Sequence, residues 1–153
     1  NLRPAPEDSL KPIKIGKGAL GPNTPDQDLY VSPNHCIQLE SSLCDLYFSE
    51  TEMLFPAKHL VGMPGVHRSD KVRFGYYHIL LDDHELIEAN GVWTESLFFG
   101  DAARTVMSAD ARAELMSIFP DLGGAGFGQK TRLPVGMRFE ASVLRWAADA
   151  GVR

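Results

Sequence analysis

The chain has few cysteines, no long apolar run and no cluster of basic residues, and each shortage excludes a class of protein. Its 153 residues include two cysteines, Cys36 and Cys44, which are too few for a disulfide scaffold. Because they do not form a Cys-x-x-Cys pair, we do not expect a structural zinc site. We interpret both as buried thiols, although a disulfide between adjacent strands stays geometrically possible.

The missing apolar run and the missing basic cluster also limit the kinds of partner that we expect this chain to bind. No segment is long and apolar enough to span a bilayer, so no membrane partner is expected. The net charge is −5, and phosphate neutralisation therefore does not favour nucleic-acid binding. Residues 1–8 show neither an apolar signal core nor an initiator Met, and we expect Asn1 to be a truncation point or a processed end.

The pattern of short apolar segments predicts a mainly β fold. Turn residues separate these segments at close spacing, as in an all-β sandwich or barrel. We expect one helical turn at 56–60, a hairpin of 43–48 with 52–55, and a longest strand at 71–81 with 85–89 as its partner. Further strands are predicted at 12–15, 29–31 and 36–39.

Helical patterns follow this β part. The first predicted helix begins at the capping residue Ser108 and ends before Pro120. The second covers 138–150, with one apolar face formed by Phe139, Val143, Trp146, Ala147 and Ala150. This tail is too short to fold alone, so we expect it to pack on the β part or on a missing neighbour. The division predicted from the sequence is a β domain over 10–100 and a helical C-terminal extension over 101–153.

The turn Ser32-Pro33-Asn34-His35 places a hydroxyl and an imidazole close together at the end of a strand. Such a pair can act on one peptide bond, because the hydroxyl can donate to its carbonyl oxygen and the imidazole can protonate its leaving nitrogen. The alternative is that Ser32 and His35 simply satisfy backbone groups of the turn.

A second group of titratable residues contains His78, Asp82 and His84. In an unbroken strand all three would share one face, whereas a turn at Asp82 and Asp83 would place the two histidines opposite each other. Either arrangement could form a metal site or an acid–base cluster, and the alternative is a solvated hairpin end. Asn90-Gly91 then predicts a tight turn between two strands.

These two groups together resemble the Hint family, which comprises Hedgehog autoprocessing domains, inteins and intein-like bacterial domains. Val31 to His35 resembles the family's Thr-x-x-His motif with Ser in place of Thr, and Tyr77-His78-Ile79 resembles the start of its C-terminal motif. His84 to Val92 resembles that motif's His-Asn-Phe-x-Ala-Asn-Gly continuation. The likeness is strongest to a bacterial intein-like subgroup and covers residues 10–100. It implies a compact Hint-type β fold.

The resemblance also implies a chemistry. In Hint domains the first residue, usually Cys, attacks the preceding carbonyl and forms a (thio)ester. His35 would then be the acid that assists loss of the amide nitrogen, and Ser32 would help to hold the oxyanion. His78 and His84 would serve later steps or position the ester.

Two departures from the family pattern bear on the activity. The nucleophile motif should lie upstream of Asn1, and Cys36 and Cys44 lie in the wrong place to replace it. Where inteins end in His-Asn and a nucleophile, this chain has Glu95-Ser96-Leu97, so full splicing is not expected. We expect N-terminal cleavage or acyl transfer in the intact parent, and an inactive chain when these 153 residues stand alone.

Two alternatives remain open from the sequence. One is a degenerate Hint fold that acts as a structural or interaction module. The other is a metal-dependent hydrolase using His35, His78, Asp82 and His84. The favoured autoprocessing hypothesis needs no cofactor, and its partners are the flanking segments of its own precursor polypeptide.

Overall fold

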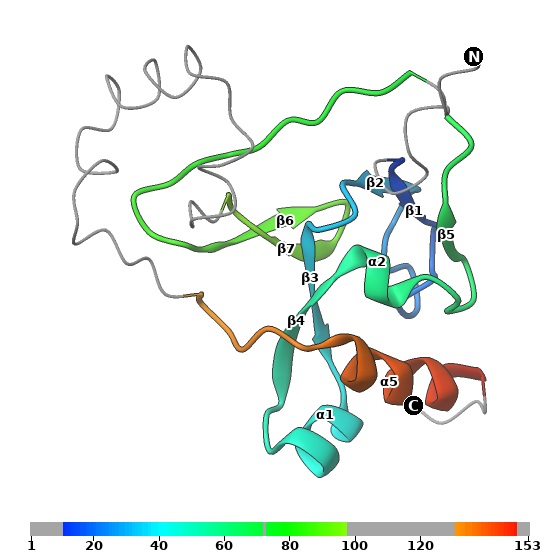
Figure 1. Ribbon diagram of the computed structural model, residues 1–153, viewed down its shortest axis with the longest axis vertical. Helices are drawn as coiled ribbons and strands as arrows, with labels where there is room; N and C mark the ends of the chain where they lie inside the picture. The colour runs from blue at the N-terminus through cyan, green and yellow to red at the C-terminus, as the bar shows by residue number, and fades with distance from the viewer. Residues whose placement is uncertain (1–10, 72, 98–130, 150–153) are drawn as a thin grey trace, which may run out of the picture.

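The computed structural model describes residues 11–71, 73–97 and 131–149, and in them it shows the mainly β fold that the sequence predicts. Helices are short in this part of the chain, and most of its regular structure is antiparallel sheet (Figure 1). The elements are β1 (Ile13–Ile15), β2 (Leu29–Val31), β3 (Cys36–Glu40), α1 (Ser42–Phe48), β4 (Glu52–Pro56), α2 (Ala57–Leu60), β5 (Val66–Arg68), β6 (Leu86–Ala89), β7 (Val92–Glu95) and α5 (Arg138–Asp149).

The strands form two antiparallel sheets. The three-stranded sheet has the order β2-β1-β5, and the four-stranded sheet has the order β4-β3-β7-β6. Ile37 of β3 lies opposite Thr94 of β7, so strands far apart in the sequence become neighbours. This pairing brings the residues that follow the Ser32–His35 turn beside the end of β7.

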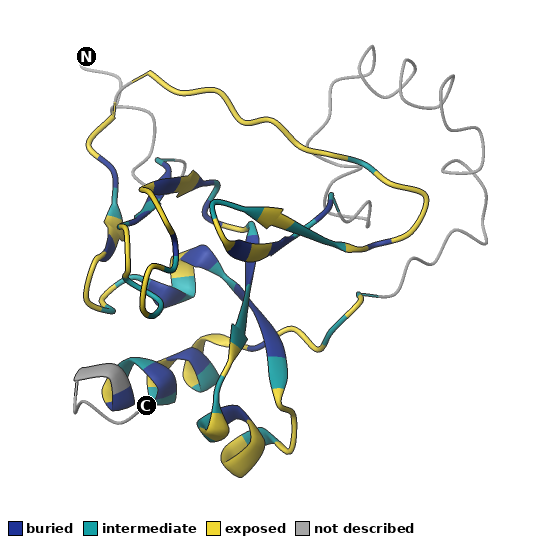
Figure 2. Ribbon diagram, turned by 180° about the vertical axis from the view of Figure 1, so that it is seen from behind, coloured by how far each residue is buried: buried dark blue, intermediate teal, exposed yellow. Residues whose placement is uncertain are grey.

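The hydrophobic core fills the space between the sheets and the helices, where buried ribbon segments meet in Figure 2. Ile13, Ile15, Ile37, Phe55 and Leu60 have fully buried side chains. The alternation in β1 explains this burial, because residues two apart in a strand face the same side. Cys36 and Cys44 are free and buried, as expected from the sequence, and burial raises the pKa of both thiols.

The turn at Asn90-Gly91 joins β6 to β7, which confirms that prediction. Both residues have positive φ, 53° at Asn90 and 75° at Gly91. A two-residue turn with this geometry matches the right-handed twist of the two strands that it joins. The hairpin fixes the register Ile87 opposite Thr94 and Leu86 opposite Glu95.

The predicted hairpin of 43–48 with 52–55 is wrong in its first half, because α1 occupies Ser42–Phe48. Ser41 caps this helix by accepting a hydrogen bond from the backbone N–H of Leu43 at 3.2 Å. Ser49 ends the helix in the left-handed conformation, with φ of 58°. The apolar residues here follow the period of a helix rather than that of a strand.

The predicted longest strand over 71–81 is also wrong. Residues 73–84, called segment 73–84 from here on, form an irregular connection that runs past the β6–β7 hairpin (Figure 1). Its apolar side chains are largely exposed, as Tyr77 is at 95% and Ile79 at 57%, so it has no buried face to stabilise a strand. Gly75 near its start further disfavours extended pairing. The predicted partner 85–89 instead pairs with β7.

The C-terminal helix is confirmed, but the predicted buried face is right at Ala147 and wrong at Phe139 and Trp146. Its buried side chains include Ala141, Leu144 and Ala147, whereas Phe139 and Trp146 are each 65% exposed. Small residues permit a close approach of α5 to α2, and the preceding segment pairs with β4 where Val135 lies beside Leu54. The extension therefore packs on the β part. The predicted helix from Ser108 and residue Ala150 lie outside the described residues.

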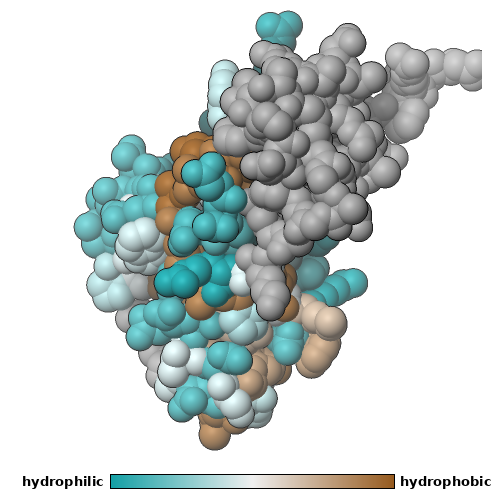
Figure 3. All heavy atoms as spheres, turned by 90° about the vertical axis from the view of Figure 1, so that its left-hand side faces the viewer, coloured by the Kyte–Doolittle hydropathy of each residue, from teal (hydrophilic) through white to brown (hydrophobic). Residues whose placement is uncertain are grey.

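None of the helices within the described ranges combines the length and apolar composition that crossing a membrane requires. Figure 3 shows one face of the molecule, on which hydrophobic residues interrupt a largely hydrophilic surface.

Candidate functional site

The turn between β2 and β3 is held in place by α2. The N–H of His35 donates to the carbonyl of Ser32 at 3.1 Å, which closes the turn. Two backbone amides at the start of α2 donate hydrogen bonds to carbonyls of the turn. Lys58 N–H donates to Pro33 O and Ala57 N–H donates to His35 O, both at 2.9 Å. The sequence encodes this turn locally, and α2 then sets the direction of the His35 side chain.

The Lys58 side chain adds a second hold on the turn. Its Nζ donates to Oδ1 of Asn34 at 2.7 Å. Pro33, the other central residue of the turn, is buried. Both central residues of the turn therefore have structural contacts. Ser32 and His35 remain directed toward the pocket described below.

His35 lies beside His78 of segment 73–84. The two ring centroids are 6.1 Å apart, and the rings are tilted by 41°. Burial lowers the pKa of His35 from its ordinary value of 6.5, the charge of Glu95 raises it, and the neighbouring His78 lowers it. His35 therefore favours the neutral imidazole more than an exposed histidine does.

Glu95, at the end of β7, accepts hydrogen bonds at both carboxylate oxygens. Its Oε1 accepts from the backbone N–H of Cys36 at 2.8 Å. Its Oε2 lies 3.2 Å from Nε2 of His84, whose side chain is fully buried. The backbone N–H of Arg132 donates to Nδ1 of His84 at 2.9 Å, so the proton of the imidazole lies on Nε2 and points at Glu95.

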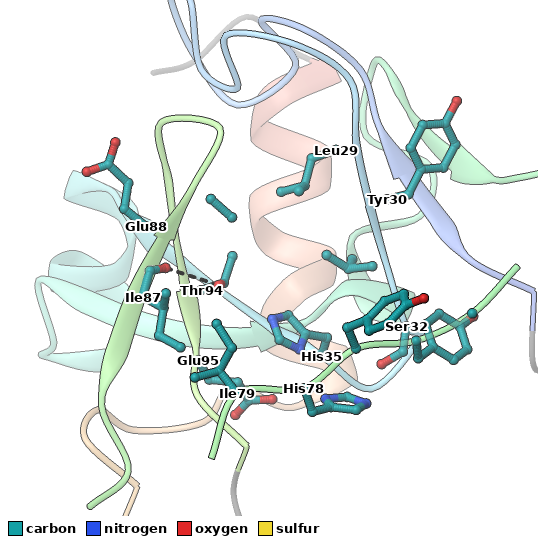
Figure 4. Close-up of a pocket in the computed structure, with 15 residues that line it drawn as sticks. Leu29, Tyr30, Ser32, His35, His78, Ile79, Ile87, Glu88, Thr94 and Glu95 are labelled. Carbon is teal, nitrogen blue, oxygen red and sulfur yellow. Dashed lines mark hydrogen bonds between the residues drawn. The ribbon is translucent and has the colours of Figure 1, made fainter. Parts of the chain in front are cut away.

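These side chains surround a pocket of about 300 Å³ (Figure 4). Ser32, His35, His78 and Glu95 form its polar part. Its remaining lining comes mainly from β2, β6, β7 and segment 73–84: Leu29, Tyr30, Val31, Gly75, Tyr76, Tyr77, Ile79, Ile87, Glu88, Ala89 and Thr94. Thr94 is fixed by donating to the carbonyl of Ile87 at 3.1 Å, the bond dashed in Figure 4. The arrangement can bind a peptide segment and transfer a proton to it.

The structure brings together three of the four residues named from the sequence. Ser32, His35 and His78 line the pocket, whereas His84 lies behind Glu95 and contacts it. Asp82 lies on the exposed part of segment 73–84 and does not line the pocket. Their roles in catalysis stay predictions.

Sequence reasoning missed Glu95 as a member of the site. In the sequence Glu95 marks a departure from the intein ending, and an acidic residue at the end of a strand carries no distinguishing pattern. The signal is the pairing of Ile37 with Thr94, which places Glu95 next to the residue that follows His35. A correct pairing of β3 with β7 would have identified it.

No metal centre is formed by the part of the chain that the structure describes. In that part, no three His, Cys, Asp or Glu side chains are arranged to hold a metal ion. The hypothesis of a metal-dependent hydrolase using His35, His78, Asp82 and His84 therefore has no ligand set among these residues.

Comparison with known proteins adds one finding. Neither the curated proteins nor the solved structures that were compared with the chain gave a match. The family model described as the Hint domain matches residues 2–101, which is more than half of the chain. The matched region contains the turn, segment 73–84 and the β6–β7 hairpin, and thus all residues of the pocket. The chain therefore belongs to the Hint domain family.

Proposed function

We propose that this Hint domain carries out self-catalysed cleavage or acyl transfer in its parent protein through a (thio)ester. A Cys, Ser or Thr upstream of the pocket residues attacks the carbonyl of the peptide bond before it. The bond from this carbonyl carbon to nitrogen breaks, and a bond to sulfur or oxygen forms. The nitrogen leaves as an amine after taking up a proton. Water or another nucleophile then releases the acyl group.

One observation carries this proposal: Ser32, His35 and His78 line the same pocket although they come from two distant segments. A hydroxyl donor beside an imidazole matches what the first step needs, an oxyanion partner and a proton donor. In the proposal, His35 protonates the leaving nitrogen and the Ser32 hydroxyl donates to the oxyanion. His78, on the exposed side of the pocket, acts in the release of the acyl group.

The proposal does not include splicing. Glu95-Ser96-Leu97 stands where inteins have the Asn that cyclises, and the side chains of Glu95 and Ser96 are committed to hydrogen bonds. Ser96 Oγ accepts from the backbone N–H of Glu85 at 2.9 Å. Without splicing, each precursor molecule would be cleaved once and would release its N-terminal part.

The test is the intact mass of a precursor that contains the native segment upstream of the domain. Incubation with hydroxylamine or a thiol, which attack a (thio)ester, should release a fragment that ends before the nucleophile. His35→Ala should remove this release, whereas His67→Ala, on an exposed residue of β5 outside the pocket, should keep it.

An unchanged precursor mass under all these conditions would contradict the proposal. It would favour the alternative, a degenerate Hint fold kept as a structural or interaction module. Release that persists in His35→Ala would contradict the role of His35 and leave the cleavage itself established.

A further inference from the structure

The carboxylate of Glu95 is held from two sides by groups that do not enter the pocket. Its Oε1 accepts from Cys36 N–H at 2.8 Å, and its Oε2 lies 3.2 Å from Nε2 of His84. The Glu95 side chain is 14% exposed, and that of His84 is 0% exposed. A carboxylate oxygen can accept two hydrogen bonds, so Glu95 can still accept a further proton donor on its pocket side.

The hydrogen bonds of His84 determine its protonation. Nδ1 accepts from the backbone N–H of Arg132 at 2.9 Å and so carries no proton. The single proton on Nε2 then points at Glu95. His84 therefore holds the carboxylate of Glu95 by donating to it from Nε2.

His35 is the pocket histidine on which the charge of Glu95 acts. Glu95 Oε1 is bonded to the backbone of Cys36, the residue that follows His35. Figure 4 shows the side chains of Glu95, His35 and His78 at the same end of the pocket, with Glu88 on the far side of the hairpin. Among the described residues, the other titratable groups that line the pocket with His35 are Tyr30, Tyr76, Tyr77, His78 and Glu88. Lys58 of α2 is bonded to Asn34 of the turn, and the thiol of Cys36 follows His35 in the chain.

The electrostatic environment of His35 contains opposing contributions. Burial and the nearby His78 both lower the pKa of His35, and Glu95 raises it. A histidine that must donate a proton needs a partner for its charged form, because a buried imidazolium without one is unstable. Among the described residues, Glu95 supplies the negative charge that can pair with a protonated His35.

We propose that Glu95 is a positioning residue of this site, whose carboxylate, held by Cys36 and His84, stabilises the protonated His35 that donates to the leaving nitrogen. This inference rests on the proposed function, since it explains how His35 can serve as an acid. His84 contributes through Glu95 and does not touch the reacting atoms.

The experiment is a titration of the histidine side chains by long-range ¹H–¹⁵N NMR on the 153-residue chain, which needs no cleavage. Glu95→Gln keeps the size of the side chain and removes its charge, and we expect the titration midpoint of His35 to move to lower pH. Glu88→Gln removes another carboxylate of the same pocket lining and should leave the midpoint unchanged. An unchanged midpoint in a folded Glu95→Gln variant would overturn the proposal.

A measurement on the wild-type chain decides the case if Glu95→Gln does not fold. The same spectra report which ring nitrogen of His84 carries the proton, and the proposal expects Nε2, the atom that lies 3.2 Å from Oε2 of Glu95. A proton on Nδ1 in place of Nε2 would overturn the proposal, because Glu95 would then lack the donor that holds it on this side.

The precursor separates this inference from the proposed function. If the precursor cleaves, Glu95→Gln should shift the pH dependence of the cleavage rate to lower pH, and Glu88→Gln should not. A rate that is lower at every pH without such a shift would assign Glu95 a purely structural role and overturn the inference. If no precursor cleaves, the proposed function fails, while the titration of His35 still tests the link to Glu95.

Discussion

Strand β7 and segment 73–84 both line the pocket, but they are anchored in different ways. β7 pairs with β3 on one side and β6 on the other, and its Glu95 is bonded at both oxygens. Segment 73–84 forms no regular element, and its side chains are mostly exposed. The site thus combines a wall fixed by the sheet with a wall that contributes His78 from an irregular connection. We expect precise geometry at the first wall and tolerance at the second.

The largest expected effect separates the two histidines. His35→Ala should lower the rate of precursor cleavage by about 10²–10⁴-fold, because it removes a proton donor from the fixed turn. His78→Ala should lower the rate less, because His78 is exposed on segment 73–84. Quenched time courses followed by mass spectrometry give both rates. Equal losses of rate would show that His78 on segment 73–84 is as important to the reaction as His35 on the fixed turn.

A pair of glycines compares the packing against β4, where the segment before α5 lies, with the packing of segment 73–84. A Cβ at Gly136 would collide with the ring of buried Phe55, so Gly136→Ala should lower the free energy of unfolding by about 1–3 kcal/mol. A Cβ at Gly75 would meet only the end of the Tyr77 ring, at 3.7 Å. Gly75→Ala should therefore change stability by less than about 0.5 kcal/mol.

Urea unfolding of the two glycine variants provides the measurement. If both substitutions cost the same, segment 73–84 is packed as tightly as the buried surface of β4, and the view of this segment as a loosely packed wall fails.

The two hydrogen bonds of Glu95 should contribute to the free energy of unfolding as well as to the reaction. In Glu95→Gln one amide N–H must face either Cys36 N–H or His84 Nε2–H, which leaves a donor unsatisfied. We expect a loss of about 1–3 kcal/mol in the free energy of unfolding. Glu88→Gln, on the exposed side of β6, should stay within about 0.5 kcal/mol of the wild type.

Urea unfolding at neutral pH checks the Glu95 prediction. Equal stabilities of the two glutamine variants would mean that the hold on Glu95 contributes nothing measurable to the folded state.

The pH dependence of stability should reflect His35, with a smaller effect than the substitutions above. Burial lowers its pKa in the folded state below 6.5, so the unfolded chain binds more protons between these two pKa values. Stability is therefore fully present above 6.5 and falls as the pH drops through 6.5 toward the lower value. The pKa of His59 is also lowered, first by burial and then by Lys58, which acts in the same direction.

The measurement compares urea midpoints at about pH 7.5 and about pH 5.5. His35→Gln should weaken the decrease that the wild type shows, and His67→Gln should leave it intact. A wild-type midpoint that rises on acidification would contradict the buried, neutral state of His35.

Local signals in the sequence were sufficient for several parts of the fold. Asn90-Gly91 set its turn through positive φ, and Ser32 to His35 set theirs through Pro33 and Asn34. Both need only neighbouring residues, so the sequence alone predicts them. The pocket members Ser32, His35 and His78 followed from the resemblance to the Hint family, whose motifs carry them.

Non-local packing decided what the sequence could not predict. Segment 73–84 has strand-forming residues, but β7 already has β3 and β6 as partners, so the segment joins neither sheet and is held at Ile79 by a backbone hydrogen bond from Leu97. The buried face of α5 depends on its close approach to α2, which favours the small Ala141 and Ala147 over Phe139 and Trp146. Glu95 joins the site through the pairing of β3 with β7, which only the fold reveals.

The most direct test of the account is the mass of the precursor during incubation with hydroxylamine. The account predicts a fragment that ends before an upstream Cys, Ser or Thr in the wild type and in His67→Ala, with no such fragment in His35→Ala. A precursor that keeps its full mass, or a His35→Ala variant that releases the fragment at the wild-type rate, would contradict it.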